Sequence, residues 1–399
     1  MLQLLIDWSE LLIRWAHVLL GITWIGTSFF FVWLDESLRR REGSDKALAG
    51  ESWMVHGGGF YRTEKYLNAP DDLPPELHWF KYEAYFTWVT GFLLLALIYY
   101  YGAETYLIDS AKADFSPWQA IGVSVASLLA GWLAYDGICR SPLGQKTGLL
   151  AVTVFILIAI AAYGYTHIFS GRAAFIHIGA FIGTMMAANV FAVIIPGQKK
   201  VTAALLAGEA PDPAIGARAK QRSLHNNYLT LPVLFMMVSN HYPMTFGHSQ
   251  AWLIALAVVI IGALVRHFFN TYDAGKLDWT GKAALPAAAA IIAALIAWTG
   301  ANIGAGGDGE PVDFAEVQQT ITKHCTGCHA ANPTTEGFDE PPKGVVLETP
   351  ESMRKFAAQI RAQVVLSDAM PLGNETEMSD EERQLLGAWV SQGAKIDTE

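Results

Sequence analysis

The sequence predicts an all-α protein, in which an eight-span transmembrane helical bundle precedes a smaller helical domain in water. The chain of 399 residues is 52% hydrophobic and 16% charged, whereas soluble domains average about 25% charged residues. It also contains eight long apolar runs. The net charge of −10 is concentrated in residues 312–399, which hold 7 basic and 15 acidic side chains. A membrane domain in lipid followed by an acidic domain in water explains this uneven distribution of charge.

Each predicted span is an apolar run of about 20 residues, the length that crosses a bilayer core of about 30 Å. The sixth run is the weakest, because Pro232 interrupts it and Asn240-His241-Tyr242-Pro243 closes it. The runs cover residues 11–34, 80–101, 117–137, 147–169, 173–196, 227–246, 250–269 and 283–303.

The loops between these runs differ strongly in their content of Lys and Arg. The basic loops carry 15 such residues and cover 35–79, 138–146, 197–224 and 270–282. The other loops carry 2 and cover 102–116, 170–172 and 247–249. Basic loops stay in the cytoplasm, so both termini are expected outside. The acidic start, with Asp7 and Glu10, lacks the basic region of a cleavable signal peptide, so the first span is retained.

Composition also excludes two classes of protein. Three cysteines are too few for a disulfide scaffold. No basic stripe is present, so nucleic-acid binding is not expected. Cys139 stands alone in an apolar stretch and is interpreted as a small buried filler.

Cys325-Thr326-Gly327-Cys328-His329 is the attachment motif of a covalent c-type haem. Two thiols one helical turn apart can each add to a haem vinyl group, and the adjacent His then binds the iron. A zinc or redox CxxC site is the alternative. A helix predicted at 313–324 and apolar residues after the motif favour one haem c.

The sixth iron ligand is expected from Met370, since thioether ligation raises the haem potential. Met353 and Met378 are the rival candidates. A helix follows at 380–392, opened by a capping box of Ser379 and Glu382. This order of elements predicts a class I cytochrome c domain. The domain is expected outside the cytoplasm, where c-haem is assembled. The expected division of the chain is 1–303 for the membrane domain, 304–311 for a Gly-rich linker and 312–399 for the cytochrome domain.

Ionisable groups inside lipid are costly and indicate functional sites. Counting along the spans places four histidines near the outer face, beneath the cytochrome domain. They are candidate ligands of a b-type haem, and hydrogen bonding between helices is the alternative that the sequence leaves open. The four are His17, His167, His177 and His241.

A second polar cluster is predicted at the cytoplasmic side, with a Gly-rich loop at His56–Tyr61 close by. Its members are candidates for substrate binding or proton transfer. Extension of the Lys and Arg side chains to the lipid headgroups is the alternative reading. The cluster consists of Lys81, Glu83, Asp136 and Arg266.

Several motifs resemble the membrane-bound bacterial urate oxidases, or urate hydroxylases, that end in a cytochrome c domain. They include Arg14-Trp15-Ala16-His17, the His56–Tyr61 loop, His78–Ala84, Asn240–Pro243 and the haem motif in the tail. The resemblance covers essentially the whole chain. It implies a bacterial inner-membrane enzyme with periplasmic termini, which converts urate to 5-hydroxyisourate. Electrons would leave through the c-haem to a downstream cytochrome c or terminal oxidase, without forming peroxide.

The residues leave the place of urate binding open. The outer histidines lie near the c-haem, whereas the cytoplasmic cluster would need an intermediate membrane haem to pass electrons on. Three other functions share these features: a quinol:cytochrome c-type oxidoreductase, a non-catalytic membrane-anchored electron carrier, and a redox-gated urate transporter.

Overall fold

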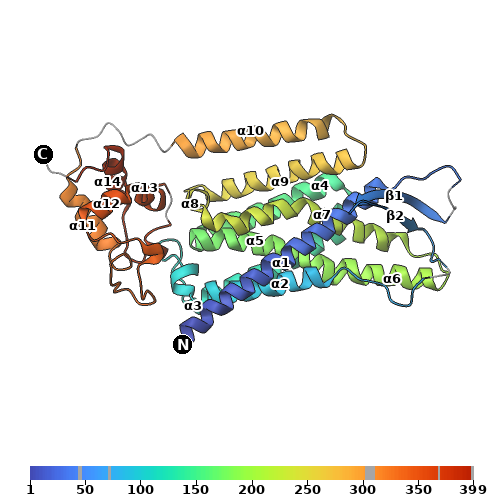
Figure 1. Ribbon diagram of the computed structural model, residues 1–399, viewed down its shortest axis with the longest axis horizontal. Coiled ribbons are helices and arrows are strands. Elements are labelled where there is room, and N and C mark those ends of the chain that lie inside the picture. The colour runs from blue at the N-terminus through green and yellow to red at the C-terminus, as the bar shows by residue number, and fades with distance from the viewer. Residues whose placement is uncertain (44–46, 71–72, 302–310, 367–368, 397–399) are drawn as a thin grey trace.

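The computed structural model describes residues 1–43, 47–70, 73–301, 311–366 and 369–396. Long helices run side by side along the molecule, with a two-stranded hairpin at one end and a small helical domain at the other (Figure 1). The N-terminus lies at the same end as the small domain (Figure 1). We call this the domain end of the bundle, and the opposite end the hairpin end.

Among the described residues there are eight such long helices, and two of them contain π-helical turns. They are α1 (Leu2–Ser37), α2 (Tyr82–Leu95) continued by η1 (Ala96–Tyr100), α3 (Pro117–Arg140), α4 (Thr147–Ile168), α5 (Gly171–Ala188) continued by η4 (Asn189–Ile194) and α6 (Ile195–Leu206), α7 (Pro213–Val238), α9 (Ala251–Asp273) and α10 (Trp279–Ala301).

Within the described residues, seven helices are long and apolar enough to cross a membrane, which is consistent with a membrane protein. The remaining predicted span, 227–246, corresponds to α7, which packs between α5 and α9. This helix begins at Pro213, inside the stretch that the sequence assigned to a loop, and its first half contains Arg222, Asn226 and Asn227. Polar side chains in that half lower its hydropathy, so the count of eight spans stays a prediction.

The hairpin is a departure from the expected all-α fold. Strands β1 (Leu48–His56) and β2 (Gly59–Tyr66) pair antiparallel. Gly57 and Gly58 both adopt positive φ, as the tightest hairpin turns require, and this explains why the Gly-rich loop reverses the chain. The buried Glu51 carboxylate of β1 accepts from the Trp53 indole and pairs with two arginines, which together lower the pKa of Glu51.

Local signals start several helices where the apolar runs begin. Ser116 and Gln119 form a capping box at α3, with Pro117 in the first turn. Ser170 caps α5 and also donates to the Tyr106 carbonyl, which ties the start of α5 to the π-helical turn η2 (Ala103–Leu107). The chain therefore passes from α4 to α5 in a very short turn at the domain end.

The described residues of the tail, 311–366 and 369–396, form a second helical domain with its own apolar core. Helix α11 (Phe314–His324) packs on α14 (Asp380–Ser391), and the Phe314 and Trp389 rings lie 6.0 Å apart. These are the two helices predicted for the tail, and the capping box of Ser379 and Glu382 is present. The shorter segments between them are η6 (Pro342–Gly344), α12 (Pro350–Lys355), α13 (Ala357–Ile360), η7 (Arg361–Val365) and η8 (Leu372–Asn374).

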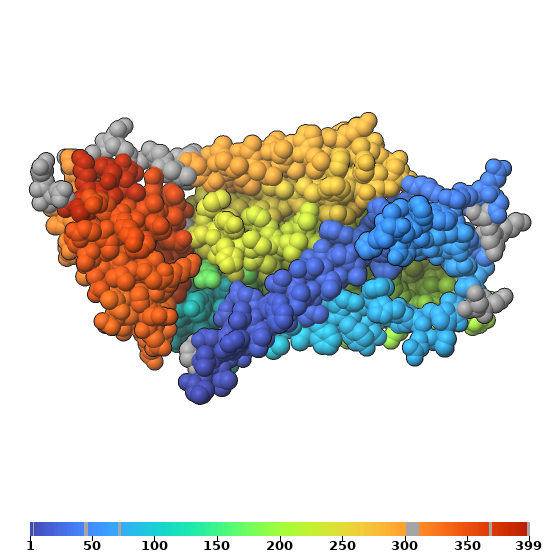
Figure 2. Space-filling model, in the orientation of Figure 1, coloured from blue at the N-terminus to red at the C-terminus, as the bar shows by residue number. Residues whose placement is uncertain are grey.

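This C-terminal domain is seated on the domain end of the bundle, as the orange and red surface in Figure 2 shows. Segment η8 contacts η2, and η7 contacts the short helix α8 (Pro243–Phe246), which follows the turn η5 (Ser239–His241). Ala369 packs against the apolar core of the bundle. Apart from Pro311, the predicted linker 304–311 lies outside the described residues.

Candidate functional site

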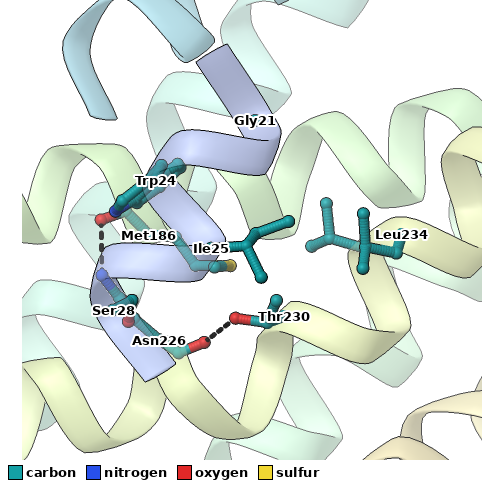
Figure 3. Close-up of a pocket in the computed structure, with 9 residues that line it drawn as sticks. Gly21, Trp24, Ile25, Ser28, Met186, Asn226, Thr230 and Leu234 are labelled. Carbon is teal, nitrogen blue, oxygen red and sulfur yellow. Dashed lines mark hydrogen bonds between the residues drawn. The ribbon is translucent and has the colours of Figure 1, made fainter. Parts of the chain in front are cut away.

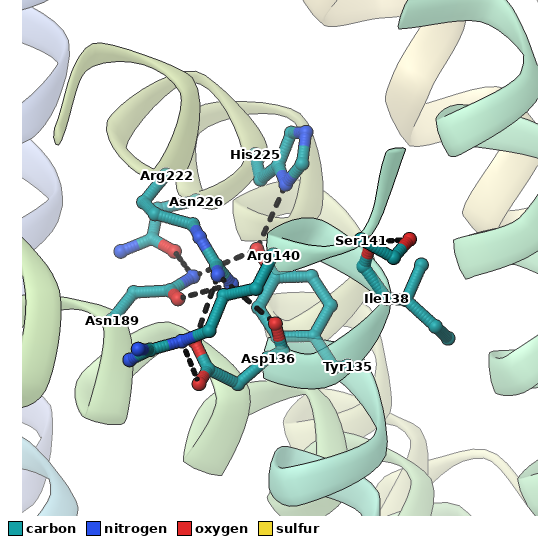
Figure 4. Close-up of polar contacts among 9 residues, drawn as sticks. All are labelled: Tyr135, Asp136, Ile138, Arg140, Ser141, Asn189, Arg222, His225 and Asn226. Carbon is teal, nitrogen blue, oxygen red and sulfur yellow. Dashed lines mark hydrogen bonds and ion pairs between the residues drawn. The ribbon is translucent and has the colours of Figure 1, made fainter. Parts of the chain in front are cut away.

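A buried polar network lies toward the hairpin end, around the first half of α7 (Figure 4). Its centre is Arg222, whose side chain is 3% exposed and pairs with Asp136 of α3 through Nη2 and Oδ1 at 2.8 Å. Arg140, one turn beyond Asp136, donates to the other carboxylate oxygen at 2.6 Å. Breaking such a buried pair on one side leaves an uncompensated charge, so the pair fixes α3 against α7.

Amide side chains complete the environment of Arg222. Asn189, in the π-helical turn η4, accepts from Arg222 at 3.2 Å and donates to the Tyr135 hydroxyl and to Asn226. The Tyr135 hydroxyl also lies 2.8 Å from Nδ1 of His225. π-Helical turns occur often at functional sites because they redirect one side chain out of the helical register. Here the turn brings Asn189 into the network.

A second group of polar side chains, next to the first along α7, joins α7 to α9. Arg266 donates to Asn227 at 3.2 Å and to Asn270 at 2.8 Å, and its guanidinium lies 4.0 Å from the centre of the Phe29 ring. Asn227 is fully buried, and its Nδ2 has no hydrogen-bond partner among the described residues. Four helices therefore contribute polar groups to one mostly buried layer, as two hydrogen-bonded groups that share α7.

A pocket opens beside this layer, between α1, α5 and α7 (Figure 3). Trp24, Ile25 and Ser28 of α1 face Asn226 and Thr230 of α7 across it. The lining is mostly apolar, and Asn226 connects it to the polar network. The side of α1 that carries Trp24 and Ser28 thus faces this pocket.

Only two of the four predicted cytoplasmic-side residues meet in this layer. Asp136 and Arg266 both contact α7, at Arg222 and Asn227 respectively. Lys81 precedes α2, with its ammonium 4.8 Å from the centre of the Tyr82 ring, and Glu83 lies in the first turn of that helix. Among the described residues, neither Lys81 nor Glu83 forms a hydrogen bond or ion pair with the network.

Sequence reasoning missed the residues that join the network. Arg222, His225 and Asn226 recur at helical spacing, which indicates a polar helix face, whereas the basic residues of 197–224 favour a loop there. Asn189 lies inside a predicted span without a charge to attract notice. The polar residues before the predicted sixth span are therefore the sequence feature that indicates an earlier start of this helix.

The four predicted haem-ligating histidines have different surroundings. His177 is fully buried, and its nitrogens lie 2.7 Å from the Ala173 carbonyl and 2.7 Å from the Ser124 hydroxyl. His17 of α1 bonds the Thr87 carbonyl of α2 at 3.0 Å. These contacts correspond to the alternative of hydrogen bonding between helices, and ligation of a membrane haem stays a prediction. His167 and His241 are exposed in this structure.

In the C-terminal domain, Cys325, Cys328 and His329 lie on one helical turn, in which the Cys325 carbonyl accepts from both following amides. Nδ1 of His329 lies 3.0 Å from the Val345 carbonyl and donates to it, so the lone pair is on Nε2. Second-sphere bonds of this kind orient a metal-binding imidazole.

The surroundings of Cys325 differ from those of a reactive redox thiol. Burial, and then the neighbouring Cys328, raise the pKa of Cys325 to about 12, whereas reactive CxxC thiols have lowered pKa values. Among the described residues no group of three or more His, Cys, Asp or Glu could hold a metal ion. A bound haem needs only axial ligands from the chain, so His329 and the two thiols fit a covalent haem.

Met370 lies in the loop after η7 and is partly buried against the domain core. Its rivals Met353 and Met378 are fully or almost fully buried within that core. Arg383 of α14, which sequence reasoning did not identify, donates to the carbonyls of Val364 and Met370, each at 2.8 Å. This buried guanidinium therefore fixes the backbone that presents Met370.

A second pocket lies where the C-terminal domain meets the bundle, and we call it the seam pocket. The bundle contributes η2, the ends of α4 and α8 and the start of α5, and the C-terminal domain contributes 369–374. Burial, and then the neighbouring Glu104 of η2, raise the pKa of Glu375 at the edge of this contact. Side chains on its wall include Tyr106, Asp109, Lys112, His167, Arg172 and Phe246.

Comparison with known proteins gives one match. The family described as "Urate oxidase N-terminal" matches residues 3–300, which cover the bundle and the hairpin. No curated protein and no solved structure matches the chain.

Proposed function

Because the chain belongs to the urate oxidase N-terminal family, we propose that it is a membrane-bound urate oxidase that passes electrons to a covalent c-type haem. The observation that carries the proposal is the contact between the family domain and the loop of Met370. Ala369 and η8 rest on the domain end of the bundle, so the proposed haem domain adjoins the region that the family defines. Such contact favours electron transfer within one chain.

His329 and Met370 would hold the haem iron, and Cys325 and Cys328 would bond the haem covalently. When bound, this group accepts one electron at a time, and its thioether ligand favours a high potential. Val345 orients His329, and Arg383 holds the Met370 backbone. Both residues that would hold the iron thus lie in segments that the chain's own hydrogen bonds fix.

The proposed reaction balances without O2. One urate monoanion and one water give 5-hydroxyisourate, one proton and two electrons. The new bond joins the water oxygen to C5 of urate, and the two electrons would need a one-electron acceptor, the chemistry that the haem held by His329 and Met370 would supply. The site must stabilise an anion, exclude side reactions and accept a proton.

The proposal includes the predicted orientation in a bacterial inner membrane, with eight spans and both termini in the periplasm. The basic loops at the hairpin end would face the cytoplasm. The C-terminal domain would then face the periplasm, where its acidic surface suits a basic electron acceptor such as a soluble cytochrome c. A terminal oxidase could take the electrons in turn.

Anaerobic reduction tests the function. Purified oxidised protein given urate should show reduced c-haem bands and release 5-hydroxyisourate in proportion to the acceptor supplied. A Cys325→Ser, Cys328→Ser variant is the matched control, since it should lose covalent haem on a denaturing gel and lose electron acceptance. Ubiquinol in place of urate tests the quinol alternative.

Three results would contradict the proposal. Product that requires O2 and appears with equal peroxide would remove the haem from the chemistry. Haem reduction by ubiquinol but not by urate would make the protein a quinol oxidoreductase. Movement of labelled urate across vesicles without product would make it a transporter. A pyridine haemochrome spectrum of the same sample counts b-type and c-type haem and so tests the membrane haem.

A further inference from the structure

We propose that the seam pocket is the urate-binding site, with Arg172 as the residue that binds the anion. This inference rests on the proposed function and specifies where its substrate sits. The pocket is lined by charged, hydroxyl and aromatic side chains. Charged and hydroxyl groups suit the polar edges of the flat urate anion, and aromatic rings suit its faces. One wall is the loop that includes Ala369 and Leu372, on either side of Met370.

Arg172 provides the uncompensated positive charge. Its Nε is buried without a hydrogen-bond partner, and no carboxylate lies within ion-pair distance, among the residues the structure describes. Lys112 differs, because Asp109 pairs with it at 3.2 Å and the Phe169 carbonyl accepts from it. A buried donor without a partner is costly, so an anion at Arg172 would remove that cost.

The backbone adds to this positive potential. Arg172 is the second residue of α5, which runs on through η4 and α6 as a long continuous helix. The first amides of a helix carry a partial positive charge that favours anions. The guanidinium and the helix start therefore act at the same wall of the pocket.

The two buried arginines of the hairpin end are less suited to binding urate. Arg222 is already paired with Asp136, and Arg266 with two asparagines and the Phe29 ring. Eighteen helical residues separate Asn189 of that network from Gly171 at the seam, which corresponds to about 27 Å at 1.5 Å per residue. Urate in the seam pocket would instead adjoin the Met370 loop and need no intermediate haem.

His167 is placed to accept the proton that the reaction releases. It lines the seam pocket, and its Nδ1 lies 2.7 Å from the Tyr163 carbonyl, to which it donates. The neutral ring therefore carries its lone pair on Nε2, the form of a general base. In this arrangement Arg172 binds urate, and His167 takes the proton as water adds at C5.

Urate titration of the detergent-purified full chain tests the site. The protein is kept reduced under anaerobic conditions, so that urate binds without turnover, and the Kd is measured by calorimetry. Arg172→Gln should raise Kd at least about tenfold, because a hydrogen-bonded charge is lost. Arg14→Gln is the matched control, since Arg14 lies at the same end of the bundle, exposed and paired with Glu10 outside the pocket, and its Kd should not change.

Two further variants keep the test decisive if Arg172→Gln folds poorly. Ala111→Trp fills the pocket from an exposed position and should raise Kd without removing a charge. His167→Gln should lower kcat for urate at least about tenfold while leaving Kd within about twofold.

Each outcome bears on a different claim. Unchanged Kd in both Arg172→Gln and Ala111→Trp, with urate still reducing the wild-type haem, would overturn the seam site and leave the proposed function intact. A changed haem potential with unchanged urate Kd would assign Arg172 to the haem and also overturn it. A wild type that neither binds urate nor is reduced by it would refute the proposed function and, with it, this site.

Discussion

Replacing Arg383 by Met should release the loop that presents Met370. Arg383 is buried and donates to the carbonyls of Val364 and Met370 at 2.8 Å, and more weakly to Asn374 at 3.4 Å. A hydrogen bond from a charged group contributes about 1.5–3 kcal/mol. Loss of the two short bonds, offset in part by burying Met in place of a charge, leaves a destabilisation of about 3 kcal/mol.

If the whole destabilisation acts on the Met370 loop, the equilibrium constant between the ordered and the released loop changes by a factor of about 100. The ferric absorption spectrum should then show partial loss of thioether ligation, and the haem potential should fall. Both are measured on the purified full chain, together with the thermal unfolding of the C-terminal domain. Arg354→Met is the matched control, because Arg354 lies exposed on α12.

Measurements on Arg383→Met can also contradict a positioning role for this arginine. A ferric spectrum and potential equal to those of the wild type, in an Arg383→Met protein that retains covalent haem, would show that this arginine does not position the axial ligand. Lower thermal stability with an unchanged spectrum would assign Arg383 to the domain core alone. Arg383→Lys should give an intermediate spectrum, since one short bond can persist.

Three further predictions follow from other contacts. The backbone cap of α14 at Ser379, and then His324, lower the pKa of Glu382 from 4.5 to about 2. The ionised carboxylate therefore stabilises the domain fully above pH 4.5, and this stabilisation is lost as the pH falls toward 2. Glu382→Gln should lower the free energy of unfolding by about 1 kcal/mol at pH 7 and flatten its acid dependence in denaturation curves. Asp136→Asn leaves Arg222 buried without its full partner and should cost about 3 kcal/mol in detergent unfolding, whereas a change under about 0.5 kcal/mol would refute the pairing. A cysteine placed at Glu209, between α6 and α7, should react only with reagents that reach the cytoplasm, and labelling from the periplasm would reverse the orientation.

The sequence by itself determined the features that depend on local chemistry or on the solvent. Apolar runs gave most of the long helices within a few residues, because a helix in lipid must be apolar along its length. The capping box of Ser379 and Glu382, and the helices that pack in the tail, were also readable from neighbouring residues. The Cys325–His329 motif lies on one turn, so its geometry follows from its spacing.

Only the tertiary structure decided how distant segments meet. Arg222 and Asp136 are 86 positions apart, and their pairing depends on α7 starting as early as Pro213 and packing beside η4, from where the Arg222 side chain reaches α3. The segment 48–66, expected to be a loop, forms a hairpin because Gly57 and Gly58 adopt positive φ. Such a turn depends on the conformational freedom of the glycine backbone, which hydropathy does not report. The seam pocket joins η2, the start of α5 and the Met370 loop, which no periodicity relates. Hydropathy selects which residues enter lipid, but the contacts between helices select which polar groups face one another.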